Sequence, residues 1–223
     1  MPRYGTIDRD YGMRLATCDP ATDGAIYMLN LMKYRDAADY DRGSDRWSGG
    51  GSGGEGGNNG SVSGREADDR YAPVDVLAAI GATVCFTADV LDASEDWDRV
   101  AVVRYPTRRS FIEMQSRKDF QEKHVHKEAG MHHTIVMATL PVGDLPARAR
   151  PGRVLLEVWA GDAPPSVQRG AAVTFDIEGT IIGDGRTWTS ARYTPLADDA
   201  DVDLSAPTAH QVLVLEPTID RWT

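Results

Sequence analysis

Short apolar segments separated by polar turns run through most of the chain, and they predict a protein rich in β-strands. Residues 26–34 are almost continuously apolar, as expected of a strand buried on both faces. The same reasoning predicts strands over 83–91, 99–105 and 133–139, with an acidic turn between the second and the third. Four strands are therefore expected in the first two thirds of the sequence.

Helical spacing appears twice between these strands. Residues 74–80 predict a short helix that ends at Gly81. After the third strand, Thr107 can cap a helix with Phe111 and Met114 facing inward, and a capping box at 116–119 is expected to start a second helical piece. Strand, helix, two strands, helix and strand form the β-α-β-β-α-β order of the ferredoxin-like plan.

A fainter copy of the four strands follows residue 150. The paired segments are 28–32 with 155–159, 81–86 with 170–175, 104–105 with 192–193, and 133–137 with 210–214. The stretches that replace the two helices are short and rich in Asp, Pro and Ser. We therefore expect the second copy to be mostly β, and to pack against the first around a shared interior that can hold a small molecule.

Polar segments define the expected domain limits. Residues 1–24 predict an N-terminal arm, residues 25–140 the ferredoxin-like domain, and residues 152–223 the reduced repeat. The insertion 48–64 is mostly Gly and predicts a flexible spacer, because it has too little apolar surface to offset its ordering entropy.

Charge and cysteine content narrow the partners and the compartment. The formal charge of −10 argues against nucleic acid, since phosphate binding requires clustered Lys and Arg. No apolar run approaches the length of a membrane span, and the N-terminus lacks a signal-peptide pattern. With only Cys18 and Cys85, no disulfide is expected, and the predicted location is the cytoplasm, without a membrane partner.

Three segments, 30–35, 102–108 and 124–131, resemble the domain-of-unknown-function 1330 family. That family belongs to the dimeric α/β-barrel superfamily, with EthD-like proteins and antibiotic-biosynthesis monooxygenases. The resemblance implies an α+β fold in which two ferredoxin-like sheets form a barrel, either in a homodimer or in an internal pseudo-dimer. It brings no agreed catalytic residues. The superfamily's activities include cofactor-free oxygenation, lactone isomerisation, polyketide cyclisation and haem chemistry.

Two polar residues interrupt matching apolar strands. Asn30 and its counterpart Glu157 are expected to point into the barrel, where Asn30 would orient a substrate carbonyl and Glu157 would accept a proton. The alternative is that the Asn30 side chain forms a hydrogen bond with a neighbouring backbone group, and that Glu157 lies at a solvent-exposed edge.

Histidines cluster near the end of the first unit. His124 is a candidate general base, and His124, Glu128 and His133 form an alternative metal site. His124 and His126 differ by about 200° around a helix and cannot share an ion. These residues would equally suit a helix C-terminus, whose dipole favours cations.

Arginine and tyrosine side chains recur at the ends of the predicted elements. Tyr34 joins the catalytic candidates, and the predicted substrate-binding residues are Arg35, Arg70, Tyr71, Arg104, Tyr105 and His126. A guanidinium beside a phenol would suit an anionic or enolic aromatic ligand. Packing at the rim is the alternative role.

The sequence thus predicts a small-molecule enzyme that acts on an apolar or aromatic, partly anionic metabolite by acid–base chemistry. Cofactor-free oxygenation, isomerisation and cyclisation are the candidate reactions, and no cofactor is expected. The alternatives are a non-catalytic ligand-binding protein and a metal- or haem-dependent oxidoreductase that uses the 124–133 region.

Overall fold

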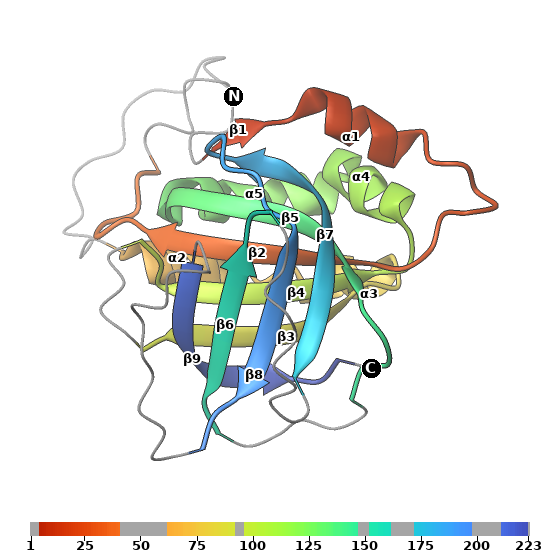
Figure 1. The fold of residues 1–223 in the computed structure, drawn as a ribbon. Helices are drawn as coiled ribbons and strands as arrows, with labels where there is room; N and C mark the ends of the chain where they lie inside the picture. Colours follow the sequence, from red (N-terminus) through yellow and green to blue (C-terminus); the bar gives the residue numbers. More distant parts are fainter. Residues whose placement is uncertain are drawn as a thin grey trace.

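An eight-stranded antiparallel barrel forms the centre of the molecule in the computed structural model, which describes residues 5–40, 62–91, 96–146, 152–161, 172–197 and 211–222 (Figure 1). The strands follow the order β7-β5-β2-β4-β3-β9-β6-β8, and β8 pairs with β7 to close the barrel. A short ninth strand, β1, pairs with the end of β7. The strand bounds are β1 Thr6–Ile7, β2 Ile26–Tyr34, β3 Thr83–Val90, β4 Arg99–Tyr105, β5 Met131–Pro141, β6 Val154–Trp159, β7 Val173–Gly183, β8 Ser190–Pro195 and β9 Gln211–Asp220.

All eight barrel strands come from one chain, four from each half of the sequence. The first half contributes the neighbours β5-β2-β4-β3, and the second half contributes β9-β6-β8-β7. Numbered within its own half, each set has the order 4-1-3-2, as in the ferredoxin-like plan. Every pairing around the barrel is antiparallel.

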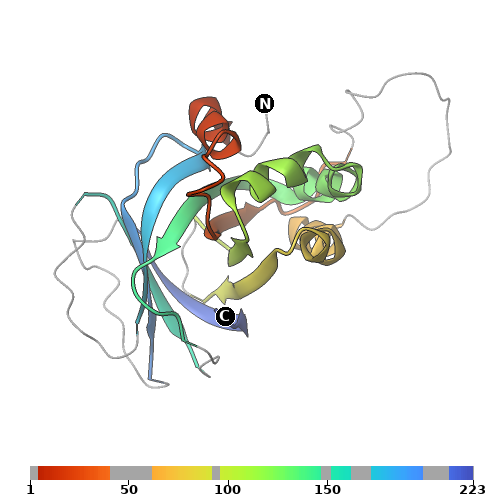
Figure 2. The same cartoon turned by 90° about the vertical axis from the view of Figure 1, so that its right-hand side faces the viewer.

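Five helices lie on the outside of the barrel in the part of the chain that the structure describes. They are α1 Arg9–Ala16, α2 Gly64–Tyr71, α3 Val74–Ala79, α4 Arg108–Ser116 and α5 Lys118–Gly130. Figure 2 shows α2 to α5 on one side of the molecule, whereas α1 packs against β7 of the second half and against α4. The predicted cap at Thr107 is confirmed, because its hydroxyl accepts from the Ser110 amide.

Alternation along the strands divides the core into two layers. Tyr27, Leu29 and Leu31 of β2 belong to the cluster inside the barrel, which we call the barrel interior. Met28 belongs to a second cluster, between the outer face of the sheet and the helices, together with Phe111 of α4. The strand is therefore buried on both faces, as its apolar sequence predicts.

Aromatic rings fill one part of the barrel interior. Trp222 stacks on Phe86 with ring centroids 5.3 Å apart, and it lies 5.4 Å from Phe175 and 5.0 Å from Tyr193. A bulge in β3 turns both Cys85 and Phe86 into this layer. The predicted ligand space in the shared interior is therefore occupied by side chains around Trp222.

Three local features refine the expectations from the sequence. Ser63 and Gly64 were expected in the flexible spacer, but Ser63 forms a capping box with Glu66 and Gly64 begins α2; residues 48–61 lie outside the described ranges. The capping box predicted at 116–119 is wrong, because the Ser116 hydroxyl bonds to the Glu113 carbonyl and α5 begins without a side-chain cap.

Both cysteines are free thiols, as expected. None of the helices in the described part of the chain has the length and apolar character needed to span a membrane.

Candidate functional site

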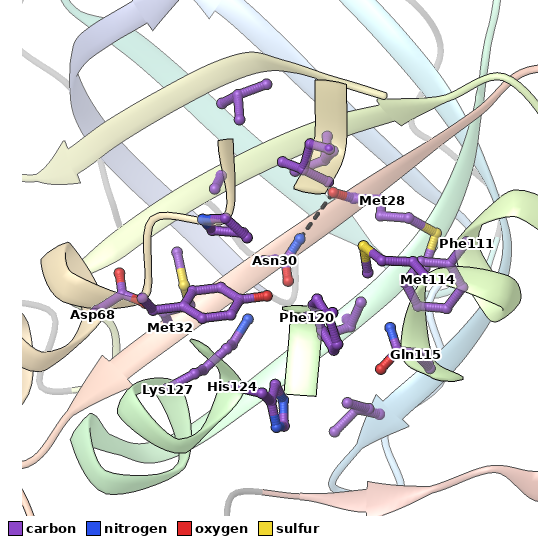
Figure 3. Close-up of a pocket in the computed structure, with 18 of the residues that line it drawn as sticks. Met28, Asn30, Met32, Asp68, Phe111, Met114, Gln115, Phe120, His124 and Lys127 are labelled. Atoms are coloured by element: carbon purple, nitrogen blue, oxygen red, sulfur yellow. Dashed lines mark hydrogen bonds between the residues drawn. The ribbon is translucent and has the colours of Figure 1, made fainter. Parts of the chain in front are cut away.

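A cavity of about 520 Å³ lies between the outer face of the first-half sheet and the helices that cover it. We call it the helix-side cavity. Figure 3 shows β2 along its floor, with side chains of α2, α4 and α5 opposite. Among the residues that line it are the apolar side chains Met28, Met32, Leu77, Phe111, Met114, Phe120, Val136 and Ile182. Ile7 and Asp69 are exposed members of the lining, so the cavity is open to solvent.

Asn30 is the polar residue at the centre of the floor. Strand alternation places it on the same face of β2 as Met28 and Met32. Its Nδ2 donates to the Met28 carbonyl at 2.9 Å, and Figure 3 shows the side chain within the helix-side cavity. The bond fixes the amide group, so its oxygen can accept a hydrogen bond from a guest.

His124 projects from α5 into the same cavity. Its ring lies 5.2 Å from the Phe120 ring and 6.1 Å from the Tyr71 ring, measured between centroids. Burial against these rings, and secondarily the Lys127 ammonium, lower the pKa of His124 to about 4. The imidazole is therefore neutral at pH 7 and can accept a proton.

Lys127 lies one helical turn after His124 and also lines the cavity. Burial lowers the pKa of its ammonium, although the nearby Asp68 carboxylate opposes that shift. The Nζ atom lies 5.4 Å from the centroid of the Tyr71 ring. The end of α5 thus presents an imidazole and an amine to one apolar space.

Two predicted tyrosines form part of the wall. The Tyr71 ring packs edge-on against Phe120, with centroids 6.1 Å apart. Tyr105 is almost fully buried, donates to the Met114 sulfur at 3.6 Å, and has its pKa raised by burial. Both rings therefore contribute to the wall of the cavity, and the Tyr105 phenol is neutral at pH 7.

An ion-pair network closes one end of the cavity. Arg99 contacts Asp68 at 3.2 Å, Asp69 at 2.9 Å and Asp89 at 3.3 Å. Tyr34 donates to the same Asp68 at 2.6 Å, and burial and then the Asp68 charge raise the pKa of its phenol. Tyr34 therefore supports the network and is absent from the cavity lining.

Four further candidates lie away from the cavity. Arg70 is exposed near the end of α2, and His126 bonds to the Tyr40 hydroxyl at 2.9 Å. Arg104 faces the opposite side of β4, close to Tyr27. The Arg35 backbone pairs with Gly130, and its buried Nε has no hydrogen-bond partner among the residues that the structure describes.

The predicted orientation of Asn30 and Glu157 is wrong. Leu156 and Val158 of β6 point into the barrel interior, so the alternate residue Glu157 points outward. Four steps around the barrel separate β2 from β6, which places the two strands on opposite walls. The two side chains therefore point away from each other and cannot share a substrate.

The alternative metal site is not assembled. His124 Nδ1 lies 3.9 Å from Glu128 Oε1, whereas His133 packs against Trp97, with ring centroids 4.8 Å apart. Within the described ranges, no three His, Cys, Asp or Glu side chains converge as metal ligands. For a haem, His124 is the histidine in the described lining of the cavity that could hold the iron, and methionine and tyrosine side chains also line it.

Lys127, Asp68 and Arg99 are site residues that the sequence reasoning missed. Two signals could have found them. Lys127 follows His124 by three positions and must share its helix face. Arg99 lies on the same face of its strand as Tyr105, because the two residues are six positions apart and side chains alternate along a strand.

Comparison with known proteins supports the fold alone. No family model matches the chain, and no curated protein matches it. The RPA0582 protein of unknown function from Rhodopseudomonas palustris, in its methylated form, is 21% identical, with a TM-score of 0.50 over 64% of this chain and 98% of its own.

Two more distant solved structures cover most of the chain. A protein proposed to be a monooxygenase, from Lactobacillus acidophilus NCFM, is 9% identical over 90% of this chain and 97% of its own, with a TM-score of 0.41. A chlorite dismutase variant from Candidatus Nitrospira defluvii is 8% identical over 93% of this chain and 95% of its own, with a TM-score of 0.39. The resemblance to the domain-of-unknown-function 1330 family therefore rests on the three sequence segments alone.

Proposed function

We propose that the protein is an enzyme that performs acid–base chemistry on a small apolar or aromatic molecule in the helix-side cavity. One observation carries this proposal: a cavity of about 520 Å³ with apolar walls holds a neutral imidazole, His124, opposite the amide of Asn30. Few polar groups in an apolar enclosure are typical of small-molecule sites. The space suits a compound of two or three fused rings.

In the proposed reaction, His124 removes a proton from a carbon or hydroxyl group of the bound molecule. Asn30, held by its bond to the Met28 carbonyl, orients the carbonyl or enol oxygen next to that position. The surrounding rings shield His124 partly from water, which strengthens its polar contacts. Enolate formation of this kind is the first step shared by isomerisation, cyclisation and cofactor-free oxygenation.

The charges of the lining favour a substrate with little net charge. Three cations, Arg9, Arg99 and Lys127, line the cavity together with three carboxylates, Asp68, Asp69 and Glu128. Arg99 is already compensated by its ion pairs with aspartates. We therefore favour a neutral carbonyl compound or a phenol over a strongly anionic metabolite.

The test is a thermal-shift screen of naphthols, hydroxynaphthoquinones and lactones, followed by turnover assays on every compound that binds. His124→Asn should reduce turnover by about 100-fold or more, the usual contribution of a general base, and should leave binding nearly unchanged. His126→Asn, on the same helix but outside the cavity, is the matched control. Equal turnover by wild type and His124→Asn would contradict the proposal.

A non-catalytic ligand-binding protein is the second candidate, favoured by the same apolar walls. It predicts stabilisation by ligands without turnover of any of them. A haem-dependent oxidoreductase would use His124 as its axial ligand, and the absorbance spectrum of the purified protein would reveal it.

We also propose that the second half is a degenerate copy of the first, so that a single chain forms an internal pseudo-dimer. The shared 4-1-3-2 strand order and the sequence echoes support this history.

A further inference from the structure

Lys127 differs from the other lysines of this protein. The sequence contains four lysines, and three of them form ion pairs: Lys33 with Asp98 at 2.9 Å, Lys118 with Glu122 at 3.6 Å, and Lys123 with Asp75 at 3.9 Å. No described carboxylate lies within ion-pair distance of Lys127. Its amine is directed into an apolar cavity, where Figure 3 shows it across from Asn30.

Asp68, the carboxylate whose charge acts on the Lys127 ammonium, already forms hydrogen bonds with other residues. Its Oδ2 accepts a hydrogen bond from the Tyr34 hydroxyl at 2.6 Å and from Arg99 at 3.2 Å. These contacts orient Asp68 toward the network at the cavity's end. Among the described residues, the Lys127 ammonium lies over the Tyr71 ring and interacts with Asp68 only through the longer-range field of its charge.

We infer that Lys127 is a nucleophilic amine that captures an apolar aldehyde or ketone as an imine within the helix-side cavity. This inference rests on the proposed function, because it uses the same cavity and gives its substrate a carbonyl group. A desolvated lysine in an apolar pocket is the usual environment of such an amine.

The step balances without any co-reactant. The Lys127 lone pair attacks the carbonyl carbon, a C–N bond forms, and the π electrons move to the oxygen. His124, one turn earlier on α5, accepts the proton released by the nitrogen and returns it to the oxygen. His124 then moves the remaining N–H proton to the carbinolamine hydroxyl, the C–O bond breaks, and water leaves as the C=N bond of the imine forms. Asn30 can hold the hydroxyl that departs.

The local environment makes this chemistry accessible near neutral pH. Burial lowers the pKa of the Lys127 ammonium, so a larger fraction is the free amine than for an exposed lysine. The groups around it are the Asp68 carboxylate, which opposes that shift, the neutral His124 and the Tyr71 phenol.

The test is reductive trapping with 2-naphthaldehyde and cyanoborohydride at pH 7, followed by intact-mass measurement and peptide mapping. We expect one naphthylmethyl group on Lys127, added faster than on the 90% exposed Lys118, because the lowered pKa of the Lys127 ammonium leaves a larger fraction of free amine. Lys127→Met, which keeps an unbranched stem, should abolish this adduct, and so should Lys127→Arg. Lys118→Arg is the matched control and should retain it.

Labelling at Lys118 and Lys123 as fast as at Lys127, or an adduct that persists in both Lys127 variants, would overturn the inference. A separate arm uses 1-naphthol, which has no carbonyl to trap. If 1-naphthol binds the cavity while Lys127 stays unlabelled, the imine inference fails and the proposed function stands. If 1-naphthol does not bind the cavity, the failure lies in the proposed function.

Discussion

At the scale of single residues, the environment of His124 determines its chemistry. An imidazole in water is half protonated near pH 6.5 and is a poor base below that pH. Contact with the Phe120 and Tyr71 rings removes water from His124, and Lys127 adds a like charge. The free base therefore persists through the physiological range.

An NMR titration of the His124 imidazole should give a pKa of about 4. The lowered pKa of His124 also makes the stability of the protein depend on pH. The unfolded chain binds a proton on this residue near pH 6.5, whereas the folded chain does so only near pH 4. Wild type should therefore lose stability relative to His124→Asn as the pH falls from about 6.5 to 4. A midpoint at or above pH 6 would contradict the assigned environment.

The sequence shows which residues could carry chemistry better than it shows where they point. His124, Tyr71, Tyr105 and Asn30 were predicted from their types and spacing, and all four line one cavity. The face of Asn30 could not be predicted, because β2 has apolar residues on both faces. Alternation separates Leu29 from Met28 without telling which of them lies inside the barrel.

At the scale of elements, the crossing of α2 and α5 positions the site. Gly64 at the start of α2 lies against Gly130 at the end of α5. This close approach brings Asp68 and Tyr71 on one helix toward His124 and Lys127 on the other. The absence of a side chain at both glycines permits the contact.

Gly64→Ala should destabilise the protein by about 2 kcal/mol or more, as overpacking a tight contact does. The new methyl group would overlap the carbonyl oxygens of Gly130 and Arg35. Urea unfolding provides the measurement. Gly24→Ala is the control, since a methyl group there meets no atom within 4 Å. Equal stability of the two variants would show that the helices do not approach as described.

A second network ties α1 and α4 to β7. Glu178 accepts from the Tyr11 hydroxyl at 3.0 Å and from Arg108 Nε at 2.9 Å. Burial alone would raise the pKa of Glu178, but the hydrogen bonds from Arg108 and Tyr11 outweigh it and lower that pKa below 4.5.

Glu178→Gln should therefore cost about 1 kcal/mol at pH 7, a typical value for a partly exposed charged hydrogen bond. The carboxylate's contribution is fully present above the unfolded pKa and disappears as the pH falls through the lowered folded pKa. Unfolding measured at pH 7 and pH 3 should thus show a difference that shrinks in acid. Glu216→Gln, at an exposed position of β9, should show neither effect.

At the scale of the whole molecule, the barrel is closed by one chain; α2 to α5 cover its first half, and α1 packs against β7 of its second half. The α+β character and the abundance of strands could be predicted, because short apolar segments alternate with polar turns along the sequence. The location of the cavity could not. Trp222, which follows β9, packs in the barrel interior with Phe86, Phe175 and Tyr193. These three residues come from strands far apart in the sequence, so the sequence pattern does not show on which side of the sheet aromatic rings fill the space.

The central claim is that ligands occupy the helix-side cavity and not the barrel interior, and methionine methyl NMR tests it most directly. Met28, Met32 and Met114 line the cavity, Met137 lies in the barrel interior, and Met13 is exposed. Titration of methyl-labelled protein with 1-naphthol should shift the three cavity resonances and leave those of Met137 and Met13 in place. The account would be contradicted if the Met137 resonance shifted while the resonances of Met28, Met32 and Met114 stayed in place.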